Sequence, residues 1–156
     1  MLKNINKNIK ILYVEDDEIA RENGIEYLQN FFEQIYEASD AIKALQLYEK
    51  YQPDIIITDI QMPKLNGLEF VKRIRQKDKK TQIIIITAFC DKDYLLKAIE
   101  LGLVKYLVKP VCEKEFEEAL FLCVNSLQNN ESNIIKLDEN SYFDIFNKNL
   151  LINEEI

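Results

Sequence analysis

The sequence predicts an α/β fold, in which a five-stranded parallel sheet carries helices on both faces and a short C-terminal β-rich tail follows. Short runs of β-branched and aromatic residues without apolar–polar alternation indicate strands that are buried on both faces. Stretches with apolar residues at three- and four-residue spacing indicate helices, and the two kinds of segment alternate over about 128 residues. Such alternation calls for right-handed crossovers, and the common strand order for five units is 2-1-3-4-5, the flavodoxin-like arrangement.

The expected strands comprise residues 9–14, 34–38, 55–58, 83–87 and 106–108, of which the second is the weakest. The expected helices comprise residues 18–32, 41–50, 68–77, 92–101 and 114–127. Asp17, Ser39 and Asp91 are candidate N-caps, because their side-chain oxygens can accept hydrogen bonds from the first free amides of a helix. Pro53 and Gly102 follow the second and fourth helices as stop signals.

Composition excludes several classes of function. The chain has 156 residues, 47% of them apolar, and a formal net charge of −7, which argues against a surface that binds the phosphates of nucleic acid. It contains no histidine, which removes the commonest general base, the histidine-activated nucleophiles and every histidine-containing zinc site. Any chemistry must therefore use carboxylates, lysines, hydroxyls or thiols.

The cysteines and the N-terminus indicate a cytoplasmic protein. Cys90, Cys112 and Cys123 form no Cys-x-x-Cys pair and have apolar neighbours, so we expect them to be reduced and buried. The apolar run near the N-terminus is short and ends in acidic residues, so it is neither a signal peptide nor a membrane span. We expect no membrane partner.

Polar side chains follow the apolar strands where each strand ends. Asp16 and Asp17 follow the first strand, Asp59 follows the third, Thr87 closes the fourth and Lys109 follows the fifth. Parallel strands bring their carboxyl ends to one edge of the sheet, where ligands bind beside the switch point of the strand order. Carboxylates that converge there repel one another, and a hard divalent cation, best Mg²⁺, relieves the repulsion.

These parts suit phosphoryl transfer, which depends on positioning and charge neutralisation and needs no histidine base. A carboxylate nucleophile would form an aspartyl phosphate. Lys109 can pair with a phosphoryl oxygen, and the Thr87 hydroxyl can donate a hydrogen bond to the same group.

Residues 8–128 resemble the receiver domain of two-component response regulators. The motifs that carry the resemblance are LYVEDDE at 12–18, IIITDIQMPKLNG at 55–67, IIIITA at 83–88 and KYLVKP at 105–110. It implies that Asp59 is the phosphoacceptor and that the phosphoryl group comes from a phosphohistidine on a partner sensor histidine kinase. It also implies a Mg²⁺ site formed by Asp16, Asp17, Asp59 and the backbone carbonyl of Gln61.

The same resemblance implies roles for the residues around the acceptor. Thr87 and Lys109 would contact the phosphoryl oxygens, and Tyr106 would turn inward when Thr87 moves. The loop after Asp59 would be shaped by Pro63 and Gly67, and a cis peptide bond would precede Pro110.

Each of these residues also has an ordinary structural interpretation. A pair of aspartates after a strand is most often a turn and an N-cap, and Asp59 alone would be a solvated turn residue. Thr87 is a common β former, Lys109 would be a surface residue, and Tyr106 packs well in a strand whether or not it switches. Their joint placement at one edge favours the functional interpretation.

The implied mechanism is a switch. Phosphorylation adds about −1.5 to −2 of charge, which would draw Thr87 and Lys109 and change the surface of the fourth helix, fifth strand and fifth helix. A homodimer could form there. The chain would be a self-phosphorylating acceptor with slow autodephosphorylation and not a turnover enzyme. Because Gln61 and Phe89 flank the acceptor, we expect Phe89→Ala to admit water and speed dephosphorylation.

The expected organisation is a receiver domain over 1–128, a polar linker over 129–133 and an apolar segment over 134–156 with two turn-like points. The last segment resembles the strands that precede the winged helix of OmpR/PhoB-type DNA-binding regulators. It implies a transcription regulator that reaches DNA through an output domain this chain does not complete. The alternatives are a docking or dimerisation hairpin on a stand-alone receiver or adaptor, and a mobile tail.

Two departures bear on the alternatives. DNA-binding receivers of that class usually have Lys-Pro-Phe and an arginine-rich fifth helix, whereas Val111 follows Pro110 here and the fifth helix has no arginine, so a dimer would use apolar contacts. A Mg²⁺-dependent phosphohydrolase with an aspartate nucleophile would need a second acid about two residues after Asp59. Gln61 occupies that position.

Overall fold

The computed structural model describes residues 2, 7–88 and 91–129, which form a five-stranded parallel sheet of order β2-β1-β3-β4-β5. The elements are β1 Lys10–Val14, α1 Glu18–Leu28, β2 Gln34–Ala38, α2 Ala41–Tyr51, β3 Ile55–Thr58, α3 Gly67–Arg75, β4 Gln82–Thr87, α4 Lys92–Glu100, β5 Lys105–Val108 and α5 Glu113–Asn129. The predicted α/β fold and strand order are confirmed. The predicted linker and β-rich tail lie outside the described residues, as do Phe89 and Cys90.

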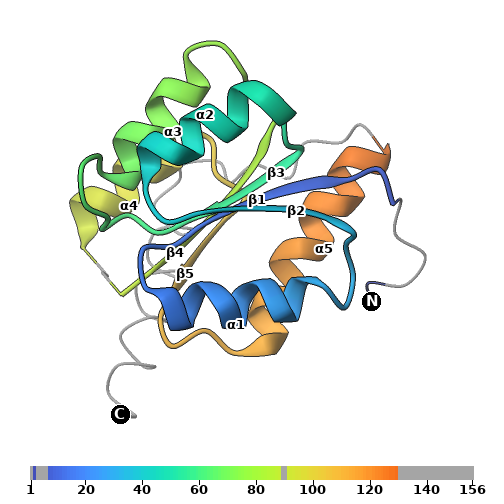
Figure 1. Cartoon of the computed structure of the whole chain (residues 1–156). Helices are drawn as coiled ribbons and strands as arrows, with labels where there is room; N and C mark the ends of the chain where they lie inside the picture. Colours follow the sequence, from blue (N-terminus) through green and yellow to red (C-terminus); the bar gives the residue numbers. More distant parts are fainter. Residues whose placement is uncertain (1, 3–6, 89–90, 130–156) are drawn as a thin grey trace.

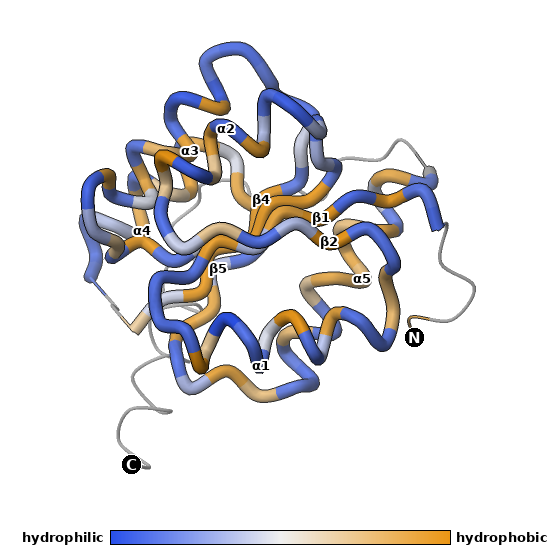
Figure 2. Tube along the Cα trace, in the orientation of Figure 1, coloured by the Kyte–Doolittle hydropathy of each residue, from blue (hydrophilic) through white to orange (hydrophobic). Residues whose placement is uncertain are grey.

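Helices cover both faces of the sheet. Figure 1 shows α2, α3 and α4 on one face and α1 and α5 on the other. Each face has its own apolar core, and neighbouring residues of β1 divide between them: Leu12 packs with α2, α3 and α4, and Ile11 packs with α1 and α5. The central strands and the inner sides of the helices are correspondingly apolar in Figure 2. Burial on both faces explains why the strand sequences do not alternate.

The register brings the strand ends level with one another. Val14, the last residue of β1, lies opposite Ala38 of β2 and Thr58 of β3, and Thr87 lies opposite Val108 of β5. The residues that follow these positions therefore gather at one edge of the sheet, as the strand order predicts.

The helix ends agree with the sequence in part. Asp17 and Asp91 are N-caps as predicted, and Gly102 has a left-handed φ of 75° just after α4. The prediction of Ser39 as an N-cap is wrong, because Asp40 is one residue nearer and its carboxylate accepts a hydrogen bond from the Lys43 amide at 2.8 Å. The first helix ends at Leu28 and not at 32, since the chain turns immediately afterwards.

Hydrogen bonds join the helices at the amino ends of the strands. The guanidinium of Arg75, the last residue of α3, donates to the carbonyl oxygens of Leu101 at 2.7 Å and Gly102 at 2.9 Å, just after α4. The Asp78 carboxylate accepts a hydrogen bond from the Tyr48 hydroxyl of α2 at 2.7 Å and another from the Thr81 hydroxyl before β4. These contacts hold α2, α3 and α4 to the same end of the sheet.

The described cysteines are free, but they differ in environment. Cys123 is fully buried in α5, and burial raises the pKa of its thiol. Cys112 is exposed in the loop between β5 and α5, so the prediction that it is buried is wrong. Among the described residues, no helix combines the length and the apolar character needed to cross a membrane.

Candidate functional site

Three carboxylates meet at the carboxyl ends of β1 and β3. Glu15, Asp16 and Asp59 each offer one carboxylate oxygen, and these oxygens all lie within 4.8 Å of one another. Glu15 and Asp59 are buried and Asp16 is exposed, so the cluster opens to solvent on one side. Such a set of oxygen ligands suits a hard divalent cation, which would also relieve the repulsion among the carboxylates.

The cluster contains two of the three carboxylates predicted as metal ligands. Asp16 and Asp59 are present, but Asp17 is not: its carboxylate accepts a hydrogen bond from the Ala20 amide at 2.8 Å and caps α1. Glu15 occupies the third place, and sequence reasoning missed it. The sequence feature that could have identified Glu15 is its position directly after the apolar strand that ends at Val14. In the structure its amide continues the strand pairing by donating to the Ala38 carbonyl at 3.1 Å.

Both carboxylate oxygens of Asp59 make hydrogen bonds. Its Oδ1 accepts hydrogen bonds from the amides of Ile60 at 2.6 Å and Gln61 at 3.2 Å, and its Oδ2 lies 2.9 Å from the Lys109 Nζ. The residue is 8% exposed, so the carboxylate is partly removed from water yet still reachable. These contacts fix the orientation of the carboxylate, and charge-assisted hydrogen bonds of this kind are stronger than those between neutral groups.

Lys109 places its ammonium between two acids. Its Nζ pairs with Glu15 and with Asp59, and its backbone amide donates to the Thr87 carbonyl at 2.8 Å. Burial alone would lower the pKa of Lys109, but hydrogen bonds to Glu15 and Asp59 outweigh it and hold the pKa above its ordinary value. The lysine therefore stays charged at this edge. The bond between Lys109 and Pro110 is cis.

Glu15 shows that the cluster fits a cation. Burial raises the pKa of its carboxyl, although the Lys109 ammonium opposes the shift. Its Oε2 is buried and finds no hydrogen-bond partner in the part of the chain that the structure describes. A buried carboxylate oxygen without a partner is costly. A divalent cation would supply the missing partner.

The predicted switch residues lie on the two strands beyond Asp59. Thr87 is fully buried at the end of β4, and Tyr106 is 4% exposed in β5. Tyr106 pairs with Ile85 in the sheet and packs in the core under α2, α3 and α4. Its ring is therefore buried on the α4 side of the sheet in this structure.

The loop after Asp59 passes very close to the backbone of Asp59. A Cβ atom at Gly67 would lie 1.9 Å from the backbone oxygen of Asp59, so only glycine fits there. The Gly67 amide donates to the Ile60 carbonyl at 2.7 Å, and the Pro63 carbonyl accepts from the Leu65 amide at 2.9 Å. These contacts fold the loop back against the residues that follow β3.

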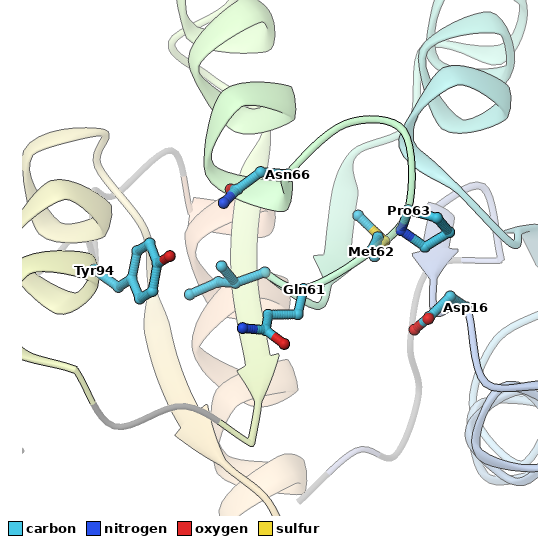
Figure 3. Close-up of a pocket in the computed structure, with 7 residues that line it drawn as sticks. Asp16, Gln61, Met62, Pro63, Asn66 and Tyr94 are labelled. Carbon is cyan, nitrogen blue, oxygen red and sulfur yellow. The ribbon is translucent and has the colours of Figure 1, made fainter.

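A hollow of about 350 Å³ lies beside this loop. Figure 3 shows Asp16 and Tyr94 on opposite sides of the loop that carries Gln61, Met62 and Pro63. Of the three clustered carboxylates, the exposed Asp16 lines this hollow.

Comparison with known proteins agrees with this geometry. Residues 11–121 match the response regulator receiver domain family. An uncharacterized response regulatory protein of Staphylococcus epidermidis is 34% identical over 121 residues, covering 76% of this chain and 47% of that protein. The transcriptional regulatory protein BtsR of Escherichia coli is 37% identical over 114 residues, covering 72% of this chain and 46% of that protein. The chain thus spans about half the length of these relatives.

A solved structure gives the same result. The N-terminal domain of an uncharacterized protein from Wolinella succinogenes is 40% identical, with a TM-score of 0.74 over 79% of this chain and 99% of that one. The strand order, the acidic cluster and the match over 111 of the residues agree. The chain belongs to the response regulator receiver domain family.

Proposed function

We propose that this chain accepts a phosphoryl group on Asp59 from a phosphohistidine of a partner sensor histidine kinase. The observation that carries the proposal is the buried Asp59 carboxylate, held by Lys109 next to the acidic pair Glu15 and Asp16. One carboxylate oxygen attacks phosphorus, the nitrogen–phosphorus bond of the donor breaks, and the imidazole leaves and takes up a proton. The product is an aspartyl phosphate.

A bound cation and the Lys109 ammonium would together neutralise the negative charge of the reacting groups. We expect Glu15, Asp16, Asp59 and the Gln61 carbonyl to hold Mg²⁺, and we leave Asp17 out because its carboxylate caps α1. The cation would supply charge neutralisation at the phosphoryl oxygens. Lys109 is ready to exchange its contact with Asp59 for one with the phosphoryl group.

Phosphorylation would then act as a switch. The new charge draws Lys109 and the Thr87 hydroxyl toward Asp59, and Tyr106 responds on the neighbouring strand. The altered surface is that of α4, β5 and α5, which could also form a homodimer. In this scheme the chain is a self-phosphorylating acceptor in the cytoplasm and turns over no external substrate.

The output is proposed to be control of transcription. This proposal is supported by relatives that are transcriptional regulatory proteins and are about twice as long as the matched region. DNA would be bound through a part of the protein other than the receiver domain. The alternative is an adaptor that acts through protein contacts alone. A phosphohydrolase is disfavoured because Gln61 stands where that chemistry needs an acid.

The test measures phosphoryl incorporation from a kinase labelled on its histidine and from phosphoramidate, which carries a similar nitrogen–phosphorus bond. The wild-type chain and Asp93→Asn, a matched change at an exposed residue, should each gain one phosphoryl group. Asp59→Asn should gain none while its circular dichroism spectrum stays unchanged. Equal incorporation into Asp59→Asn would refute the assignment.

A further inference from the structure

Arg21 in α1 reaches back to the acidic cluster. Its Nη1 donates a hydrogen bond to the backbone carbonyl of Glu15 at 2.9 Å, and its Nε lies 3.5 Å from a carboxylate oxygen of Glu37 on β2. The Arg21 side chain is only 15% exposed, whereas that of Glu37 is 53% exposed. The guanidinium thus holds the main chain at Glu15, the first residue of the cluster. Its own position is held by the ion pair with Glu37 on the edge strand β2.

The segment between β1 and α1 is held at successive points. The Glu15 amide donates to the Ala38 carbonyl at 3.1 Å, and the Asp17 carboxylate accepts from the Ala20 amide at 2.8 Å. Arg21 binds the peptide carbonyl between Glu15 and Asp16, which is the peptide that joins two of the three clustered carboxylates. Rotation of that peptide would swing both side chains.

We infer that Arg21 is a positioning residue for the cation site, an inference that rests on the proposed function. It contacts none of the reacting groups described above; it sets the direction in which Glu15 and Asp16 present their carboxylates. Its planar fork serves two partners at once, which a lysine ammonium on a flexible stem cannot reproduce in the same geometry. Groups that orient metal ligands in this way typically change metal affinity 10- to 100-fold when lost.

If Arg21 has this role, its replacement should change Mg²⁺ affinity in the direction opposite to the one that simple electrostatics predicts. A positive charge near the cluster repels a divalent cation, so removal of the charge alone would tighten cation binding. Loss of the positioning contact would weaken it instead. The sign of the change in Mg²⁺ affinity therefore separates the two effects.

The experiment measures the Mg²⁺ dissociation constant of the full chain by isothermal titration calorimetry. We expect Arg21→Gln to weaken Mg²⁺ binding about tenfold and Arg21→Lys, which keeps the charge, to weaken it several-fold. Arg73→Gln is the matched control, since Arg73 is 48% exposed on α3 and pairs with Glu69 at 3.8 Å. It should leave the affinity within about twofold of wild type because exposed pairs contribute little.

A second measurement separates positioning from loss of the fold. At saturating Mg²⁺ the rate of phosphorylation by phosphoramidate should recover most of its wild-type value in Arg21→Lys, while an unfolded variant would not recover. Unchanged or tighter Mg²⁺ binding in folded Arg21→Gln overturns the inference; if that variant does not fold, unchanged binding in Arg21→Lys overturns it. Absence of Mg²⁺ binding in the wild-type chain would instead refute the metal part of the proposed function.

Discussion

Gly67 shows how a single residue without a side chain affects the position of Asp59. Because a Cβ there would lie 1.9 Å from the Asp59 carbonyl oxygen, Gly67→Ala must push the loop and the backbone of Asp59 apart. We expect a loss of about 2 kcal/mol in the free energy of unfolding, in the range for overpacked sites. Urea denaturation measures this loss, and phosphorylation by phosphoramidate should slow in the same variant.

The control for this prediction is Lys72→Ala on the same helix. Lys72 is exposed, so its replacement should change the free energy of unfolding by less than about 0.5 kcal/mol. A Gly67→Ala variant as stable and as reactive as Lys72→Ala would contradict the close approach described above.

At the scale of the residue, the sequence predicts part of the set of side chains that meet at the sheet edge. Asp16, Asp59 and Lys109 follow from the rule that parallel strands end at one edge. The choice between Glu15 and Asp17 does not follow from that rule. It depends on which residue still continues the backbone pairing of β1 and which residue already caps α1. That boundary is set by the pairing of Glu15 with Ala38 of β2, a contact between distant parts of the chain.

At the scale of the element, α1 contains a glycine in its interior. Gly24 faces Tyr13 of β1, and a Cβ at Gly24 would lie 2.4 Å from the Tyr13 hydroxyl oxygen. Alanine favours a helix over glycine by about 1 kcal/mol, but here it would displace the buried ring. We predict that Gly24→Ala destabilises the wild-type chain by about 1–2 kcal/mol and stabilises a Tyr13→Leu chain by about 1 kcal/mol.

A double-mutant cycle in urea tests this reversal of sign. The two single variants and the double variant give the coupling between the ring and the helix. If Gly24→Ala had the same effect in both backgrounds, the ring would not be the reason for the glycine.

Element types were predictable where the local pattern is strong. Strands buried on both faces and helices with one apolar side are readable from the sequence, and β3, buried along its whole length, keeps its predicted bounds. The end of α1 was not readable, because 29–32 continue an apolar spacing while the chain already turns to enter β2. Tertiary packing decides that boundary.

At the scale of the whole molecule, Asp78 links α2, α3 and β4. Its burial would raise its pKa, but hydrogen bonds from Thr81 and Tyr48 hold the pKa at about 2, below that of an unfolded aspartate. A lowered pKa stabilises the fold above the unfolded pKa and loses this effect as pH falls through the folded one. We therefore expect Asp78→Asn to cost about 1 kcal/mol at pH 7 and progressively less between about pH 4 and pH 2.

Unfolding of both chains by urea at several pH values measures this difference. Tyr48→Phe removes one of the hydrogen bonds to Asp78 and should weaken the same dependence on pH. A difference between wild type and Asp78→Asn that stays constant down to pH 2 would show that the carboxylate is not stabilised in the fold.

The architecture of the described residues was predictable because each level of the sequence agrees with it. Apolar strands, periodic helices and polar strand ends all favour one parallel sheet, and the order β2-β1-β3-β4-β5 followed. What the sequence leaves open is the partner and the output, since these depend on surfaces outside one chain. The predicted tail over 134–156 stays a prediction.

The Lys109 contacts have a further consequence for the balance of charge. Glu15, Asp16 and Asp59 carry three formal negative charges when ionised, and the Lys109 ammonium between two of them removes one. The remaining excess equals the charge of one divalent cation, so a loaded site would be electrically neutral. The phosphoryl group would then be added to a site without net charge. The net charge at the site after phosphorylation would be the charge of the phosphoryl group.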